Sequence, residues 1–114
     1  MKIPENAKLL RIFIGESDQH EGKPLYEAIV HKARRQGLAG CTVLRGIEGF
    51  GASSRVHTAK ILRLSEDLPI VIEIVDAAEK IEAFSRELDG IVDEGLVTLE
   101  NIQVLLYRHD KNVA

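Results

Sequence analysis

Hydrophobic and polar residues alternate with a period of two in several short stretches of the chain, a pattern that predicts β-strands. The first stretch spans residues 9–14, and Gly15 ends it. Its apolar set, on one side of the strand, is Leu10, Ile12 and Ile14. A strand of this kind buries one face against a second layer of structure.

The same reasoning predicts three more strands. A short β-branched run surrounds Thr42 and Val43. A third extended piece, residues 59–64, resumes as residues 70–75 after a bend at residues 67–69, because Pro69 lacks the N–H that a β-ladder needs. The last strand is predicted over residues 96–107, with Ile102, Val104 and Leu106 on one side.

A helical period predicts a first helix from Pro24 to about Gln36. Its buried stripe is Leu25, Ile29 and Ala33. Proline suits the first helical position because its missing N–H would have no partner there, and Gly37 suits a left-handed cap.

A second helix is predicted to start at Asp76 and to stop near Gly90. Asp76 and Glu79 have the spacing of a capping box, with Asp76 as the N-cap. The buried stripe of this helix is Ile81, Phe84 and Leu88.

This order of elements predicts an α+β fold, the ferredoxin-like βαββαβ plan, with an antiparallel sheet and two helices on one face. In residues 70–75 both alternating sets are apolar except Glu73, so both faces of that strand need a cover. Since the helices cover only one face, a second copy of the chain is the simplest cover for the other. We therefore expect a closed homo-oligomer.

Composition narrows the classes of function. The 114 residues fit a single domain, 1–114, with a structured core of about 8–108. A net charge of −3 and the lack of a basic stripe argue against nucleic-acid binding. Cys41 is the single cysteine, and the first residues contain no apolar segment typical of a signal peptide, so we expect a cytoplasmic protein without membrane insertion.

The candidate chemistry lies in the loop that follows Thr42 and Val43. Its glycines, Gly46, Gly49 and Gly51, fall within six residues, and Ser53, Ser54, Arg55 and His57 follow. Bare backbone N–H groups and guanidinium groups both bind phosphate, so Gly49, Gly51, Arg45 and Arg108 are a plausible phosphate set if they meet in space. The alternative is a hairpin loop whose glycines are needed for positive φ.

Other chemistries have weaker signals. Glu16, Asp18, His20 and Glu21 resemble a metal site, but a polar turn before a helix explains them as well. Cys41 has no identifiable base beside it, and neither serine stands in a nucleophile elbow. We therefore expect no enzymatic activity.

Several motifs resemble those of the PII signalling proteins: residues 37–43, then Gly49-Phe50-Gly51, then residues 67–75. The PII-like family known as domain of unknown function 190 is more similar still, through residues 22–25, 45–47, 56–57 and 64–65. The resemblance covers roughly residues 8–108 and depends on the whole set of motifs, since a single Gly-x-Gly is a weak signal.

The resemblance implies a homotrimer that binds an adenine nucleotide (AMP, ADP, ATP or cyclic AMP) in the clefts between subunits. Thr42 matches a threonine that contacts adenine, Gly49 and Gly51 match the glycines at the loop base, and Arg108 matches a phosphate-binding arginine. Phe50 lies within the glycine motif. The inner phosphate arginine is replaced by Leu106, so a mono- or diphosphate is the expected ligand. Ser53 occupies the position of the 2-oxoglutarate and magnesium glutamine, which is a departure from the family's 2-oxoglutarate site.

The leading hypothesis is thus a PII-like regulator whose 46–58 loop reports nucleotide occupancy to a protein partner such as a membrane transporter or channel. Ser53, Ser54, Arg55 and His57 would form the partner loop. Two alternatives stay open. One is a divalent-metal-binding trimer of the cation-tolerance type that uses His20 and His57; the other is a small enzyme with an inter-subunit site.

Overall fold

The computed structural model describes residues 3–51, 57–58 and 67–108. The elements in chain order are β1 (Asn6–Gly15), β2 (Gln19–His20), β3 (Lys23–Pro24), α1 (Leu25–Arg35), β4 (Thr42–Arg45), β5 (Glu48–Gly49), β6 (His57–Thr58), β7 (Pro69–Asp76), α2 (Ala78–Leu88) and β8 (Leu96–Gln103). The predicted strand at residues 59–64 lies outside the described residues. Both helices have 11 residues, and within the described part of the chain no helix has the length and apolarity of a membrane span.

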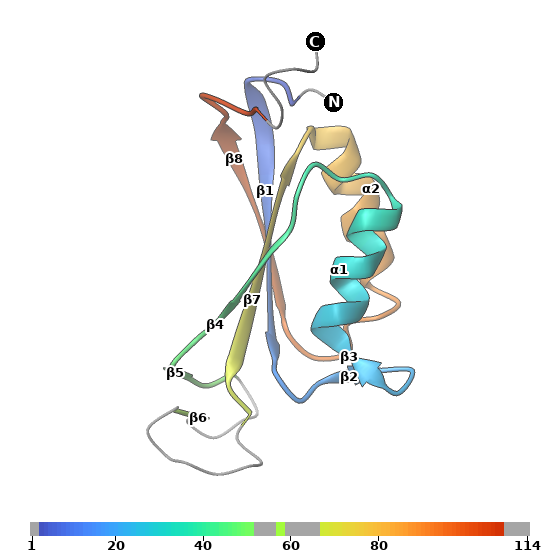
Figure 1. Ribbon diagram of the computed structural model, residues 1–114, viewed down its shortest axis with the longest axis vertical. Coiled ribbons are helices and arrows are strands. Elements are labelled where there is room, and N and C mark those ends of the chain that lie inside the picture. Colours follow the sequence, from blue (N-terminus) through green and yellow to red (C-terminus); the bar gives the residue numbers. More distant parts are fainter. Residues whose placement is uncertain (1–2, 52–56, 59–66, 109–114) are drawn as a thin grey trace.

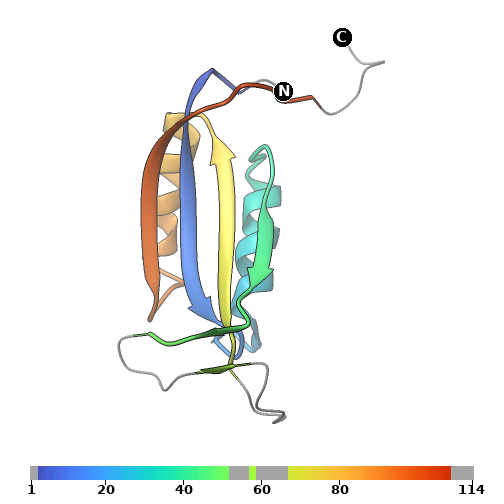
Figure 2. The same ribbon diagram turned by 90° about the vertical axis from the view of Figure 1, so that its left-hand side faces the viewer.

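The four long strands form one antiparallel sheet in the order β4-β7-β1-β8. Both helices lie on one face of this sheet, and the other face is open (Figure 1). The view onto that face shows the four strands side by side with the helices behind them (Figure 2). The predicted ferredoxin-like α+β fold is therefore confirmed.

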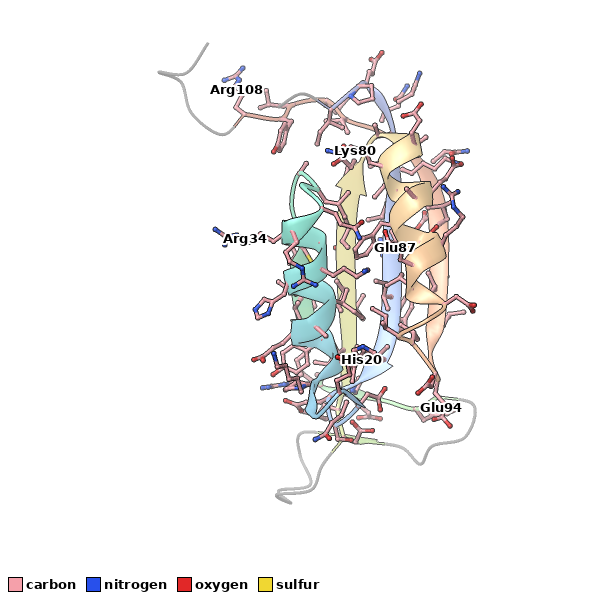
Figure 3. All side chains as sticks on the ribbon, turned by 90° about the vertical axis from the view of Figure 1, so that its right-hand side faces the viewer. His20, Arg34, Lys80, Glu87, Glu94 and Arg108 are labelled. Atoms are coloured by element: carbon pink, nitrogen blue, oxygen red, sulfur yellow. The ribbon has the colours of Figure 1, made fainter. Side chains whose placement is uncertain are left out.

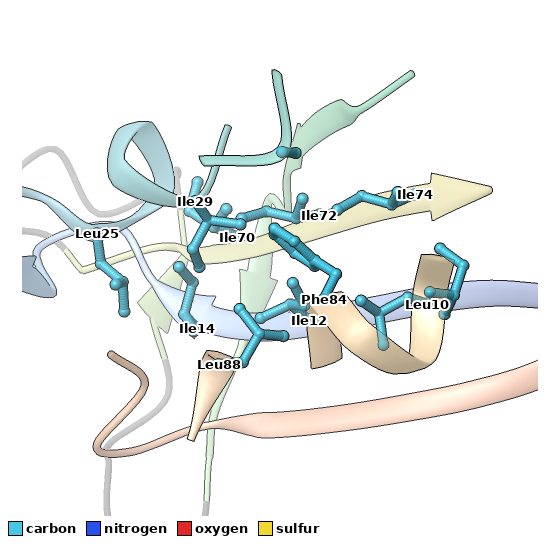
Figure 4. Close-up of a cluster of buried hydrophobic side chains, with 12 residues drawn as sticks. Leu10, Ile12, Ile14, Leu25, Ile29, Ile70, Ile72, Ile74, Phe84 and Leu88 are labelled. Carbon is cyan, nitrogen blue, oxygen red and sulfur yellow. The ribbon is translucent and has the colours of Figure 1, made fainter. Parts of the chain in front are cut away.

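The hydrophobic core lies between the sheet and the helices. It contains both predicted helix stripes and the inward sets of β1 and β7, and Figure 4 shows them interlocked. The largest fully buried side chains are Phe84, Leu10, Ile12, Ile29, Ile72, Ile74, Ile81 and Asp76. Dense apolar packing of this kind fixes the helices on the sheet. Asp76 is the one charged side chain among these buried residues.

The C-terminal end of α1 matches the prediction, whereas the N-terminal end of α2 does not. Gly37 adopts φ +73° after α1, and Leu38 N–H donates to the carbonyl of Ala33, so the left-handed cap is confirmed. The predicted capping box of α2 is wrong. Asp76 is the last residue of β7, and the N-cap is Ala77, which makes no side-chain capping bond.

Two other boundaries also shift. Pro24 is the N-cap of α1 instead of its first helical residue. The last strand ends at Gln103, earlier than expected, because the chain then leaves the sheet after a single further bond from Val104 N–H to the carbonyl of Glu5. The segment 104–108 crosses the end of the sheet, as Figure 2 shows.

The open face of the sheet is banded. The strand register aligns Leu44, Val71, Phe13 and Leu96 across all four strands, and we call these residues the apolar row. The next row toward the chain ends is polar and consists of Thr42, Glu73, Arg11 and Thr98. In the apolar row Leu44 is 48% exposed and Leu96 is 57% exposed, so a large apolar surface faces outward.

Candidate functional site

A cavity of about 290 Å³ opens on this face, at the end of the sheet where β1 begins and β8 ends. Its lining residues are Ile3, Leu9, Ala39, Gly40, Cys41, Thr42, Glu73, Val75, Val104, Leu106 and Tyr107. Most of these side chains are apolar, and the polar groups are few. Small-molecule sites generally have this composition, with apolar walls and a small number of orienting polar groups.

Three parts of the chain build the walls. The turn between α1 and β4 provides Ala39 to Thr42, and the sheet provides the floor. The segment 104–108 closes the third side, and there the hydroxyl of Tyr107 donates to the carbonyl of Ala39 at 3.2 Å. The cavity thus exists because the segment 104–108 folds back over the turn.

The polar side of the cavity is electrostatically organised. Glu73 accepts a hydrogen bond from Arg11 Nε at 2.8 Å, and Arg11 Nη1 also pairs with Glu100. The hydrogen bond with Glu73 raises the pKa of Arg11 above its usual range. The Glu73 carboxylate is therefore charge-compensated from one side and can accept hydrogen bonds from a ligand in the cavity on the other.

Cys41 is half-buried in the cavity wall, just before β4. Burial raises the pKa of its thiol, which keeps the uncharged form at neutral pH. The thiolate is the reactive form of cysteine, so this environment favours a packing role over a nucleophilic one.

Of the residues predicted for nucleotide binding, Thr42 lines this cavity. Arg45 lies at the far end of β4, where its guanidinium pairs with the carboxylate of Glu16. Three residues of extended strand, roughly 10 Å, separate it from Thr42.

Two of the predicted glycines, Gly46 and Gly49, lie near Pro69 at the same far end. A Cβ added to Gly46 would lie 2.7 Å from Pro69 Cγ, and one added to Gly49 would lie 3.2 Å from it. Neither Gly46 nor Gly49 adopts positive φ, so positive φ does not explain these two glycines. Glycine is needed at Gly46 because the backbone passes close to a proline ring.

The remaining predicted binding residues do not converge within one chain. Phe50 is 73% exposed beside these glycines. Figure 3 places Arg108 on the C-terminal segment, at the end of the molecule opposite β5. A site that uses Arg108 together with Gly49 and Gly51 therefore needs more than one copy of the chain.

The predicted partner loop is only partly described. Ser53, Ser54 and Arg55 lie outside the described residues. The backbone of His57 pairs with Gly49 in the β5–β6 ladder, which joins the two ends of the loop.

The carboxylates of the 16–21 turn have partners in the fold. Asp18 Oδ2 accepts the N–H of Gly15 at 2.9 Å, and the carboxylate of Glu16 pairs with Arg45. The Nε2 atom of His20 lies 3.8 Å from Oε1 of Glu21. In the part of the chain that the structure describes, no group of three or more His, Cys, Asp or Glu side chains is arranged to hold a metal ion. The polar-turn explanation accounts for these residues.

Glu73 and Tyr107, which line the cavity, were missed as site residues by sequence reasoning. The signal for Glu73 was present, because it is the single charged residue within residues 70–75. Nothing local indicates that Tyr107 reaches Ala39, which is 68 positions away in the chain.

Comparison with known proteins places the sequence and the fold in context. Residues 7–104 match the model of a protein family described as DUF190, Uncharacterized ACR, COG1993. A UPF0166 protein from Aquifex aeolicus (strain VF5) is 43% identical over 98 residues, which cover 86% of this chain and 92% of that protein.

Two solved structures share the fold. CPII, a nitrogen regulatory PII-like protein from Thiomonas intermedia K12 bound to ADP, AMP and bicarbonate, superposes with a TM-score of 0.64 at 19% identity, over 87% of this chain and 94% of that one. The divalent ion tolerance protein CutA1 from Ehrlichia chaffeensis gives a TM-score of 0.57 at 9% identity, over 91% of this chain and 86% of that one. At such identities the likeness establishes the architecture alone.

Proposed function

Because the chain belongs to the DUF190 family and has the fold of PII-like proteins, we propose that it is a regulatory protein that binds an adenine nucleotide at the subunit boundary. The nucleotide is the effector of the protein, and no catalysis is involved. The 46–58 loop then reports occupancy to a protein partner, for which a membrane transporter or channel is our candidate. A loop that is ordered by ligand contacts is a known kind of switch.

The observation that carries this proposal is the apolar cavity with Thr42 and Glu73 on one side. A flat heteroaromatic ring buries its faces against apolar side chains and satisfies its edge with a few hydrogen bonds, which this lining offers. The CPII structure that shares the fold holds ADP and AMP, which makes adenine nucleotides the first ligands to test.

The phosphate group would extend over the open face along β4, toward the end of the strand where Gly46 and Gly49 follow. Arg45 lies opposite the buried Ile70, on the helix-covered face, and is therefore not on this path. Arg108 of the chain that holds the ring lies at the wrong end for this, so Arg108 of a neighbouring subunit is the one we assign to the phosphate. This assignment requires a closed homo-oligomer, and we propose a homotrimer in which the open sheet faces turn inward. The apolar row is the part of the face that gains most from such burial.

Titration calorimetry against AMP, ADP, ATP and cyclic AMP tests the proposal. At least one nucleotide should bind, with a mono- or diphosphate preferred. Silence for all four ligands at millimolar concentration would reject it.

Two variants test the assigned residues in the same assay. Thr42→Val keeps the shape of the side chain and removes its hydroxyl, and it should weaken binding by about 1 kcal/mol. Arg108→Ala should weaken it by roughly 1.5–3 kcal/mol, because a charged hydrogen bond to phosphate is lost. Thr98→Val and Arg35→Ala are the matched controls, since Thr98 shares the polar row outside the cavity and Arg35 is exposed at the end of α1. If a variant and its control weaken nucleotide binding equally, the residue changed in that variant is not a nucleotide contact.

The fold shared with CutA1 supports one second candidate, a metal-binding oligomer that uses His20 and His57. Metal analysis of protein purified without added metal separates the two candidates. A stoichiometric divalent ion together with no nucleotide binding would favour the second.

A further inference from the structure

Asp76 is the one buried polar or charged residue in the described part of the chain, with 1% of its surface exposed. It lies at the junction of β7 and α2. Its Oδ1 accepts the N–H of Ala77 at 2.6 Å, and its Oδ2 accepts the N–H of Ala39 at 2.9 Å. The second bond reaches 37 positions back along the chain to the turn that forms a wall of the cavity.

Lys80, one helical turn further along α2, reinforces this contact. Its Nζ lies 3.7 Å from Asp76 Oδ2 and donates to the carbonyl of Gly37 at 2.8 Å. Asp76 and Lys80 therefore hold both sides of the turn, one through an N–H and the other through a carbonyl. A buried carboxylate is tolerated because it has these partners.

The opposite side of the same turn is bound by the C-terminal segment. The carbonyl of Ala39 accepts the hydrogen bond from Tyr107, so the N–H and the carbonyl of one residue link α2 to the segment 104–108. The turn also contains Gly37 and Gly40, and glycine backbones have wide conformational freedom unless they are held. The wall of the cavity thus takes its shape from these bonds.

We propose that Asp76 is the positioning residue of the cavity: through Ala39 it holds the 37–42 turn in the shape that a ligand meets. The carboxylate touches no ligand itself. A preformed wall lowers the ordering cost of binding, so the loss of this bond weakens affinity without removing any ligand contact. Only the identity of the ligand rests on the proposed function; the positioning of the turn is independent of it.

The test compares Asp76→Ala, Asp76→Asn and Tyr107→Phe by amide hydrogen exchange and by ADP titration. Asp76→Ala should raise the exchange rate of the Ala39 amide at least tenfold and the Kd for ADP roughly tenfold. Asp76→Asn leaves a single acceptor oxygen for the N–H groups of Ala39 and Ala77, so it should raise both values, but by less than Asp76→Ala does. Tyr107→Phe removes the second link and should raise the Kd for ADP while leaving the amide of Ala39 protected.

Ile29→Val is the control for general destabilisation, because it truncates a core side chain on α1 away from the turn. It should lower the Tm while leaving the Ala39 exchange rate and the Kd unchanged. If the Asp76 variants lower the Tm in the same way and do nothing more, Asp76 is merely structural and the inference is overturned.

The inference and the proposed function fail separately. If wild-type protein binds no adenine nucleotide but Asp76→Ala selectively exposes the Ala39 amide, the positioning role stands and the proposed function falls. If ADP binds equally to wild type and all Asp76 variants, the inference falls and the function stands. Should Asp76→Ala not fold, Asp76→Asn and Tyr107→Phe decide through the same two measurements.

Discussion

Single glycines in this chain serve different purposes, and the space around each one decides what a side chain there would do. Gly95 adopts φ +152° where the chain enters β8, and an added Cβ would lie 2.6 Å from the carbonyl oxygen of Phe13. Gly40 has no atom within 4 Å of such a Cβ. Backbone atoms in a sheet cannot move aside cheaply, whereas open space accepts a methyl group.

Gly95→Ala should therefore lower the free energy of unfolding by about 2–4 kcal/mol, through strain at the backbone and a clash with β1. Gly40→Ala is the matched control and should change it by less than about 0.5 kcal/mol. Chemical denaturation of both variants measures the difference. Similar midpoints for the two would show that Gly95 is not constrained in this way.

At the scale of elements, the two helices are joined by a polar link as well as by the core. Glu87 of α2 accepts hydrogen bonds from Lys32 Nζ at 2.9 Å and from Gln36 Nε2 at 2.7 Å, both from the end of α1. Both bonds lower the pKa of Glu87 below its ordinary value of 4.5, and the bond from Lys32 has the larger effect.

A carboxylate whose pKa is lower in the folded than in the unfolded state stabilises the fold above its unfolded pKa. This stabilisation is lost as the pH falls through the lowered folded value, which places the loss below pH 4.5. Lys32→Gln should raise the pKa of Glu87 toward 4.5, as measured by NMR titration of its carboxyl carbon. Lys8→Gln, which removes the partner of Glu82 on the same helix, should leave Glu87 unchanged. If the Lys32 variant leaves the pKa where it is, the link is not formed in solution.

The elements themselves were predictable where local pattern and tertiary packing agree. The stripes of α1 and α2 and the alternation in β1 and β7 specify their own buried faces, and the structure buries those residues. Asp76 shows where this breaks down. Its capping-box spacing is a local signal, but the carboxylate instead bonds Ala39, a partner 37 positions away that no local pattern reveals.

The candidate site was predictable to the same limited degree. Motif resemblance singled out Thr42, which does line the cavity, whereas Glu73 and Tyr107 enter it only because distant segments meet. The glycines of the 46–51 stretch were assigned to phosphate binding or to positive φ, whereas the structure shows a proline ring against Gly46 that leaves no room for a side chain.

At the scale of the whole molecule, the open face of the sheet is the feature that demands an explanation. The apolar row crosses four strands and is not covered by the chain itself, and exposed apolar surface of this extent typically marks an interface. The proposed homo-oligomer would bury it.

Leu96→Lys should disrupt that assembly, because it places a charge in the apolar row without touching the core. Val97→Lys is the matched control: Val97 is 40% exposed, is the next residue of β8 and points to the opposite face. Sedimentation velocity should give a smaller species for Leu96→Lys and the wild-type species for Val97→Lys, with both variants folded by circular dichroism. Identical sedimentation of both variants and wild type would place the interface elsewhere.

The pairing of β1 with β8 also has a consequence during synthesis. The first strand to leave the ribosome sits in the interior of the sheet, yet its neighbour on one side is the last strand to be made. Until residues 96–103 emerge from the exit tunnel, the backbone of β1 keeps an unpaired edge, and the nascent chain cannot complete its sheet. A nascent chain that stalls before Leu96 should thus lack the pairing of β1 with β8 and should be a target for chaperones.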